Sequence, residues 1–242
     1  MREVEITSIH RMTPRVKQFE LVADEAFEYE PGQHTHLHFE RDGDGGGDGE
    51  TEDEEVVRPY TATGLPGTNR ITLAIKRYDD GTASVYMHDR EPGDTIEIEE
   101  LDGNLSLRDL DSDVAFVSTG TGITPMMAMV KQYLRDGSGN ATFLYGEKTQ
   151  EDVMYRETLD QLEAEHENLT VVYSLSDEDW SGRTGHVQAH IEDVVPDPEA
   201  TDFYCCGVPG MVVETTEKLA DIGVPDERIY SEGWEEDEVS EE

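Results

Sequence analysis

Cysteine is nearly absent from this 242-residue chain, which has only the two neighbours Cys205 and Cys206. Two adjacent thiols cannot form the disulfide framework of a small secreted domain. They also cannot supply the four thiolates that an iron–sulfur cluster takes from its protein. The sequence therefore excludes a disulfide scaffold and a resident iron–sulfur cluster.

Basic residues are scarce as well, because 18 Lys and Arg stand against 57 Asp and Glu, a formal net charge of −39 at pH 7. Proteins bind phosphate backbones through clustered Lys and Arg. We therefore expect no nucleic-acid partner. Hydrophobic residues, at 35%, still follow regular strand and helix patterns. That patterning indicates a folded protein with an acidic, solvated surface rather than a disordered chain.

Long apolar runs are missing too. No stretch reaches the roughly 18 apolar residues of a membrane span, and Met1-Arg2-Glu3 does not begin a signal peptide. These absences predict a cytoplasmic protein without a membrane partner.

A cation, an aromatic ring and a hydroxyl gather in residues 58–64, Arg-Pro-Tyr-Thr-Ala-Thr-Gly. Arg58, followed by Pro59, can bind phosphate oxygens through two parallel hydrogen bonds, which a lysine cannot reproduce. In an extended segment Tyr60 and Thr61 point to opposite faces. Tyr60 can then lie against a flavin ring while Thr61 donates to flavin N5, the atom that accepts hydride. An edge strand entering a turn is the alternative interpretation.

A glycine and two hydroxyls follow the next expected strand, residues 71–78. Gly81, Thr82 and Ser84 open a short predicted helix that runs to about residue 89. Glycine lets the backbone approach a ligand, and the free N–H groups of a helix start favour an anion. We predict that this turn binds the flavin pyrophosphate together with Arg58. A capped helix without a ligand is the alternative.

Two segments raise the question of metals. His34, His36 and His38 alternate along an expected strand, but no carboxylate or cysteine is fixed beside them in the sequence, so we interpret them as an ordinary sheet face. Residues 41–55 are acidic and glycine-rich, which is typical of a mobile hairpin insertion. A calcium loop starting at Asp42 fails because Gly46 stands where a side-chain oxygen is needed. We therefore predict no specific metal site.

In the second half the pattern of predicted elements changes, because apolar strands alternate with helices. The strands are expected at 115–118, 141–145, 170–174 and 202–206, and the helices at 126–134, 151–165 and 186–194. This order predicts a doubly wound parallel sheet. The short alternating strands of the first half predict a small antiparallel β-barrel. We place the barrel at residues 1–108, the α/β domain at 109–234 and an acidic tail at 235–242.

A glycine-rich loop follows the first parallel strand. Its glycines free the backbone to approach a phosphate, its threonines offer donors, and its proline suits a first helical turn. The residues predicted to bind a nucleotide there are Thr119, Gly120, Thr121, Gly122 and Pro125. Proline replaces the third glycine of the usual dinucleotide fingerprint. The methionines that follow are typical of helix core.

Ligands of such sheets lie at the carboxyl ends of the strands, which places Gly120, Gly146, Ser174 and Cys206 along one rim. The last strand continues into a motif that contains Gly207, Pro209 and Met211. A thiol at this rim is within reach of a nicotinamide. A small buried side chain is the alternative.

Five motifs in this order resemble the ferredoxin–NADP reductase superfamily of flavin oxidoreductases over nearly the whole chain. They are Pro31-Gly32-Gln33, Arg58-Pro59-Tyr60-Thr61, the turn from Gly81 to Ser84, the loop from Gly120 to Pro125, and Cys206-Gly207 with Pro209 and Met211. The ending Glu232-Gly233-Trp234 is similar to the acidic-x-aromatic ending of many members. The acidic tail after Trp234 departs from the pattern.

The resemblance implies an FAD-binding barrel, an NAD(P)H-binding domain and hydride transfer from nicotinamide C4 to flavin N5 at their junction. Tyr60 would stack on the flavin, Thr61 would contact N5, Cys206 would flank the nicotinamide, and Trp234 would cover the flavin ring. The electron acceptor would be a separate molecule, such as a ferredoxin or an oxygenase component. An electron-transfer subunit of a larger complex and a non-catalytic nucleotide-binding module are the competing hypotheses.

The donor is expected to be NADH rather than NADPH. Leu175 stands where NADPH-specific members often carry an arginine for the 2′-phosphate, and acidic residues follow it. Carboxylates repel that phosphate and suit a ribose hydroxyl. Arg183 is the residue that can reverse this preference.

The acidic, lysine-poor composition resembles that of proteins from salt-loving organisms, in which concentrated salt screens self-repulsion. We predict a melting temperature that falls when KCl is lowered from molar to millimolar concentration. A thermal melt at each concentration checks this, and equal melting temperatures would contradict it.

Overall fold

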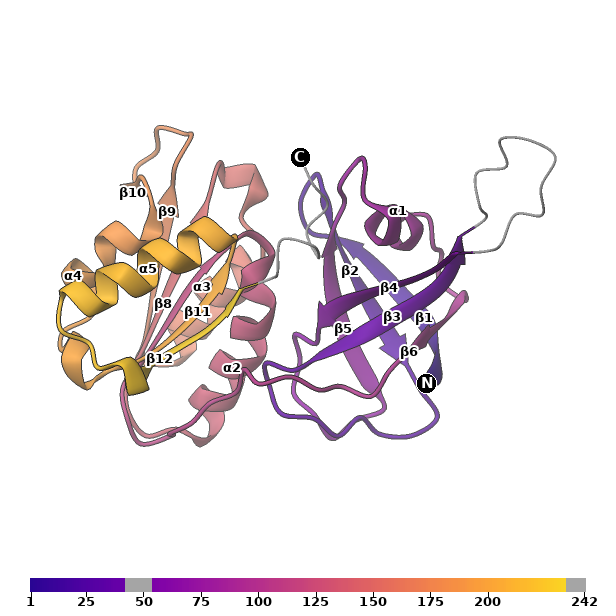
Figure 1. The fold of residues 1–242 in the computed structure, drawn as a ribbon, viewed down its shortest axis with the longest axis horizontal. Helices are drawn as coiled ribbons and strands as arrows, with labels where there is room; N and C mark the ends of the chain where they lie inside the picture. The colour runs from indigo at the N-terminus through magenta and orange to yellow at the C-terminus, as the bar shows by residue number, and fades with distance from the viewer. Residues whose placement is uncertain (42–53, 234–242) are drawn as a thin grey trace.

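The computed structural model describes residues 1–41 and 54–233, which form two domains lying side by side (Figure 1). The first is an antiparallel six-stranded sheet in the order β4-β3-β6-β1-β2-β5. Its strands are β1 (Arg2–Arg11), β2 (Val16–Val22), β3 (His34–Arg41), β4 (Glu54–Thr61), β5 (Arg70–Lys76) and β6 (Thr95–Ile98).

The sheet closes on itself, because a bridge between Ala62 and Leu73 brings the end of β4 beside β5. Alternate residues of each strand therefore face one interior, where Ile6, Phe19, Leu37 and Ile98 are fully buried. Helix α1 (Thr82–His88) packs near one end of the barrel (Figure 1). The predicted antiparallel barrel is confirmed.

The second domain is a parallel sheet in the order β10-β9-β8-β7-β11-β12. Its strands are β7 (Val114–Thr119), β8 (Ala141–Glu147), β9 (Leu169–Leu175), β10 (Arg183–Thr184), β11 (Asp202–Gly207) and β12 (Ile229–Gly233). Its helices are α2 (Ile123–Asp136), α3 (Arg156–Glu165), α4 (Ile191–Val194) and α5 (Pro209–Asp221).

Helices cover both faces of this sheet. Phe116 and Cys206 belong to the apolar cluster that contains α2 and α3 residues, whereas Val117 and Cys205 belong to the cluster that contains α4 and α5 residues. Neighbouring strand residues point to opposite faces, so the two adjacent cysteines are separated by the sheet. The predicted doubly wound arrangement is confirmed.

Helix α2 lies on the side of the parallel sheet that faces the barrel (Figure 1). Its apolar cluster includes Val16 and Ala74 of the barrel and Leu105 of the connecting segment. Gly32 marks one close approach at this junction, because a Cβ there would lie 2.2 Å from Leu105 O and 3.1 Å from Met129 Sδ. The two domains therefore share part of one core.

Two expected helices differ from the structure. The helix predicted over 151–165 begins only at Arg156, because Tyr155 adopts a left-handed φ of 55° and a separate 3-10 turn, Gln150–Asp152, precedes it. The helix predicted over 186–194 is a 3-10 turn, Val187–His190, followed by the four-residue α4. Periodicity alone did not reveal either break.

The histidine face of β3 also differs, because it does have a carboxylate beside it. Glu99 lies 2.7 Å from His38 Nε2 and 3.3 Å from His36 Nδ1. The hydrogen bond from His38 lowers the pKa of Glu99. No group of three or more potential ligands that could hold a metal occurs within residues 1–41 and 54–233.

Within the same ranges no helix is both long and apolar enough to cross a membrane. The acidic insertion from residue 42 to 53, Trp234 and the tail at 235–242 lie outside the described residues.

We expect Gly32→Ala to destabilise the protein more than Gly67→Ala. Both glycines have a left-handed φ, +110° and +95°, and share the cost of about 1–2 kcal/mol for a Cβ there. Within the described part of the chain a Cβ at Gly67 meets no atom within 4 Å, whereas one at Gly32 collides with backbone, which adds about 1–3 kcal/mol. Guanidinium unfolding midpoints measure the difference, and equal losses would contradict the shared junction.

Candidate active site

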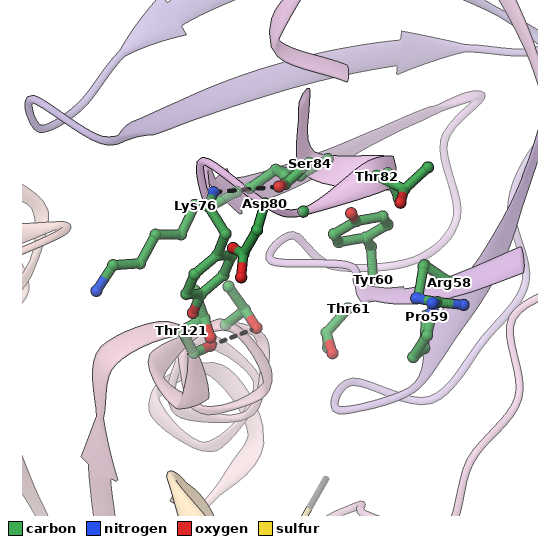
Figure 2. Close-up of a pocket in the computed structure, with 15 residues that line it drawn as sticks. Arg58, Pro59, Tyr60, Thr61, Lys76, Asp80, Thr82, Ser84 and Thr121 are labelled. Atoms are coloured by element: carbon green, nitrogen blue, oxygen red, sulfur yellow. Dashed lines mark hydrogen bonds between the residues drawn. The ribbon is translucent and has the colours of Figure 1, made fainter. Parts of the chain in front are cut away.

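A pocket opens where the barrel meets the second domain. Strands β4 and β5, the start of α1 and the segment around Thr121 and Thr124 form its walls. Its polar and charged lining residues are Arg58, Tyr60, Thr61, Lys76, Tyr78, Asp80, Thr82, Ser84, Thr121 and Thr124 (Figure 2). The fold thus gathers the predicted flavin motif, the predicted pyrophosphate turn and part of the predicted nucleotide loop around one cavity.

Strand β4 presents the flavin motif as predicted. Figure 2 shows Tyr60 and Thr61 pointing to opposite sides of the strand, with Arg58 and Pro59 next to them. Arg58 Nη1 donates to Val57 O at 2.8 Å, the one hydrogen bond its guanidinium makes within residues 1–41 and 54–233, so its other N–H groups can reach a ligand. Burial raises the pKa of Tyr60, with Arg58 acting in the opposite sense, so the phenol stays protonated at neutral pH.

Thr61 is 4% exposed, and its Oγ1 has no hydrogen-bond partner among the described residues. A buried hydroxyl without a partner costs about 1–3 kcal/mol unless a ligand or water satisfies it. The hydroxyl is therefore poised for a ligand that occupies the pocket.

One polar side chain of the turn into α1 is already hydrogen-bonded within the turn. Ser84 Oγ accepts a hydrogen bond from Tyr78 N at 3.1 Å, and a Cβ on Gly81 would lie 2.4 Å from that oxygen. Gly81 precedes the helix in an extended conformation, and no side chain of the described residues caps the helix start. Thr82 and the free N–H groups thus remain the donors that this turn offers to the pocket.

The loop after β7 packs closely against the backbone of β11. Gly120 has a φ of +54°, and a Cβ on Gly122 would lie 2.2 Å from Cys206 O. Gly122 therefore serves backbone packing in this structure, and the phosphate contact predicted for it stays a prediction. The Oγ atoms of Ser118 and Thr119 are buried without a partner in the described part of the chain, so they join Thr61 in offering unused hydroxyls.

The predicted rim is confirmed by strand register. Thr119 pairs with Gly146, Gly146 with Ser174, and Ser118 with Cys206. At its β11 end, a Cβ on Gly207 would lie 2.4 Å from both Thr119 Oγ1 and Met211 Cε, so these groups form one tight cluster.

Several predicted residues do not line the pocket. Ser174 is buried and donates to Gly185 O at 2.7 Å, and Pro125 is buried in the first turn of α2. Cys206 is fully buried, and Pro209 is exposed at the start of α5. Their predicted roles in cofactor binding rest on the sequence alone.

Burial also fixes the chemistry of the two thiols. Desolvation raises the pKa of Cys205 to about 12 and raises that of Cys206, near Glu232, still further from its usual range. Both side chains are therefore neutral thiols in the folded protein. Any role of Cys206 beside a nicotinamide would use its size and polarisability rather than a thiolate.

The lining residues that sequence reasoning missed include three polar or charged residues of one segment, Lys76, Tyr78 and Asp80. They stand at the end of β5 and in the turn before Gly81, so their position next to a predicted ligand turn was the available signal. Lys76 adds a second cation to Arg58, which suits a ligand that carries phosphates.

Models of two protein families match the chain in order. The oxidoreductase FAD-binding domain matches residues 3–106, and the oxidoreductase NAD-binding domain matches residues 116–217. Ferredoxin–NADP reductase B of Sorangium cellulosum is 31% identical over 249 residues, which is 96% of this chain and 97% of that protein. The chain belongs to the ferredoxin–NADP reductase family.

A second curated relative matches a smaller part of this chain, and a solved structure matches nearly all of it at lower sequence identity. One subunit of the Na⁺-translocating NADH-quinone reductase of Yersinia pestis is 29% identical over 197 residues, and the chain spans 48% of that subunit's length. The FAD/NAD-binding domain of nitric oxide dioxygenase from Vibrio cholerae superimposes with a TM-score of 0.85 at 22% identity, over 96% of this chain and 98% of that one.

The residues of the pocket fit FAD. The unused hydroxyl of Thr61, the free guanidinium N–H groups of Arg58 and the open start of α1 together supply donors for a flavin ring and its phosphates. The chain is thus a flavin oxidoreductase in which electrons pass from NAD(P)H to FAD and on to a separate acceptor.

We expect neither thiol of the folded protein to react with an aromatic disulfide reagent at pH 8, because both are buried and neutral. Unfolding in guanidinium should release two equivalents, and absorbance of the displaced thiolate counts them. One rapidly reacting equivalent in the native protein would show that one of the two thiols is accessible.

Proposed function

We propose that this chain is an NADH-preferring reductase that binds FAD between β4 and α1 and delivers electrons to a separate one-electron carrier. The unused, buried hydroxyl of Thr61 carries the proposal. FAD, when bound, supplies a ring that takes a hydride at N5 and releases electrons singly. The protein supplies binding, orientation and exclusion of water.

The side chains divide this work. Tyr60 offers a protonated, largely buried ring for stacking, and Thr61 offers a donor on the opposite side of β4. Arg58 offers a cation to phosphates on one side of the pocket, and Lys76 adds a second cation on the other side, near the acceptor Asp80. Thr121 and Thr124 bring the nucleotide loop to the same cavity, so both ligands would meet where the domains join.

The preference for NADH rests on the loops that follow β8 and β9. Arg183, the residue able to reverse the preference, donates to Asp193 Oδ2 at 2.8 Å and is therefore already committed to a carboxylate. Glu178 accepts from Gln150 N at 2.7 Å and from Gln150 Nε2 at 2.6 Å, which fixes a negative charge between these loops. A 2′-phosphate would meet repulsion there, whereas a ribose hydroxyl would not.

A second candidate function is an electron-transfer subunit of a larger complex. The match to a subunit of the Na⁺-translocating NADH-quinone reductase favours it. Co-purification with other subunits, together with slow turnover of small acceptors by the isolated chain, would distinguish it from a free reductase.

An anaerobic absorbance spectrum in molar KCl, recorded after reconstitution with FAD, tests the proposal. We expect flavin bands that bleach rapidly with NADH and at least tenfold more slowly with the same concentration of NADPH. The opposite preference would refute the donor assignment. A protein that retains no flavin would refute the function and favour a non-catalytic module.

Thr61→Ala is the matched variant in the same experiment. Losing a donor that the reacting ring uses should lower the bleaching rate about 10²-fold with little change in FAD content. Thr82→Ala is the control, since it removes a pocket hydroxyl away from N5 in this proposal. Equal rates for wild type and Thr61→Ala would remove Thr61 from the reaction.

A further inference from the structure

Thr63, two residues beyond Thr61, receives hydrogen bonds from the other domain. Lys131 Nζ of α2 donates to Thr63 O at 2.9 Å, and Tyr155 OH donates to Thr63 Oγ1 at 3.2 Å. Thr63 is 1% exposed and is also paired with Thr72 of β5 through N–H and hydroxyl contacts. This residue therefore joins the two edge strands of the barrel to two helices of the nucleotide domain.

The position of Lys131 on α2 links this contact to the pocket. Thr124 lines the pocket at the start of the helix, and Lys131 follows seven residues later. Seven residues are about two turns, or ~10 Å, so both side chains lie on one face of α2. On the barrel side, Thr63 lies ~7 Å along the chain from Thr61. The contacts that Lys131 and Tyr155 make with Thr63 therefore lie close to both walls of the pocket.

Tyr155 is held in an unusual conformation at this point. It is the one non-glycine residue with a positive φ among the described residues, at 55°, and it immediately precedes α3. Bulky side chains rarely adopt this region, and they persist in it only when the surroundings over-determine it. The hydroxyl bond to Thr63 and the 8% exposure of Tyr155 identify the surroundings that do so.

The polar contacts are enclosed by the apolar packing between the domains. Val16 and Ala74 of the barrel belong to the same cluster as Met126, Met129 and Tyr155. Burial lowers the pKa of Lys131, in agreement with this enclosed position. Hydrogen bonds in such surroundings are stronger and more rigid than exposed ones.

We propose that Lys131 and Tyr155 are positioning residues for hydride transfer, because together they fix the end of β4 against α2 and α3 and so set the separation of the flavin strand from the nucleotide loop. The inference rests on the proposed function. Neither side chain lines the pocket, so both act through Thr63 rather than on the ligands.

Anaerobic stopped-flow bleaching of the FAD-loaded protein by saturating NADH tests the proposal, with Tyr155→Phe and Lys131→Met. We expect each variant to lower the limiting bleaching rate about tenfold, because small displacements of reacting atoms are costly. FAD content and the NADH concentration at half-maximal rate should change less than twofold. NADH deuterated at the transferred position should give an isotope effect at least as large as in wild type.

Matched controls separate positioning from stability. Tyr133→Phe removes a buried hydroxyl on α2 that donates to Ser112 O within the nucleotide domain, and Lys218→Met removes a lysine paired with Glu192 between α5 and α4. Tyr133→Phe should lower the melting temperature without slowing the bleaching, and Lys218→Met, which removes only an exposed ion pair, should leave both nearly unchanged. Wild-type bleaching rates in Tyr155→Phe and Lys131→Met, or slower bleaching with no isotope effect, would overturn the proposal.

Hydrogen exchange gives a readout that needs no activity. The amides of Ala62 and Thr63 donate to Gln33 O and Thr72 O, and Tyr155→Phe should speed their exchange about tenfold while Tyr133→Phe leaves it unchanged. If wild type fails to bleach with either nucleotide, the proposed function fails. In that case unchanged exchange in Tyr155→Phe would also refute the claim that the Tyr155–Thr63 hydrogen bond fixes the end of β4. Faster exchange would support that claim.

Discussion

Packing between helix α2 and the barrel is the constraint on which the rest of the molecule depends. A hydride moves only between atoms nearly in contact, so a reductase built from two domains needs them fixed at their junction. Helix α2 achieves this because its side chains share one apolar cluster with the parallel sheet and with Val16 and Ala74 of the barrel. The nucleotide loop at its start and Lys131 two turns later therefore move with the flavin strand.

The pocket at that junction is built from backbone geometry and left incomplete in hydrogen bonding. Register places Ser118, Thr119 and Cys206 at the rim of the parallel sheet, outside the pocket lining, whereas β4 brings Thr61 into that lining. In the described ranges, the hydroxyl of Thr61 at the pocket and those of Ser118 and Thr119 at the sheet rim are buried without partners. Since buried polar groups in proteins are normally satisfied, the unpartnered hydroxyl of Thr61 in the pocket lining is the strongest physical sign of a ligand site.

Charge serves two separate purposes in this chain. The excess of 57 acidic over 18 basic residues is spread over a solvated surface, whereas two of the scarce cations, Arg58 and Lys76, stand at the pocket. Elsewhere the basic residues are mostly tied to carboxylates, as Arg183 is to Asp193 and Arg228 to Asp202. A phosphate-bearing ligand thus finds positive charge at the pocket and negative charge between the loops after β8 and β9.

The sequence by itself determined the barrel, the parallel sheet, the rim and the motif at residues 58–61, because alternation, glycine placement and side-chain chemistry are local properties. The tertiary structure alone decided that Glu99 lies beside the histidine face, that Lys76 and Tyr78 line the pocket, and that Gly122 serves packing against Cys206. It also decided the left-handed Tyr155 and its bond to Thr63, which lies 92 residues away in the chain. Such contacts depend on how elements far apart in the sequence meet in space, and a local sequence pattern does not contain that information.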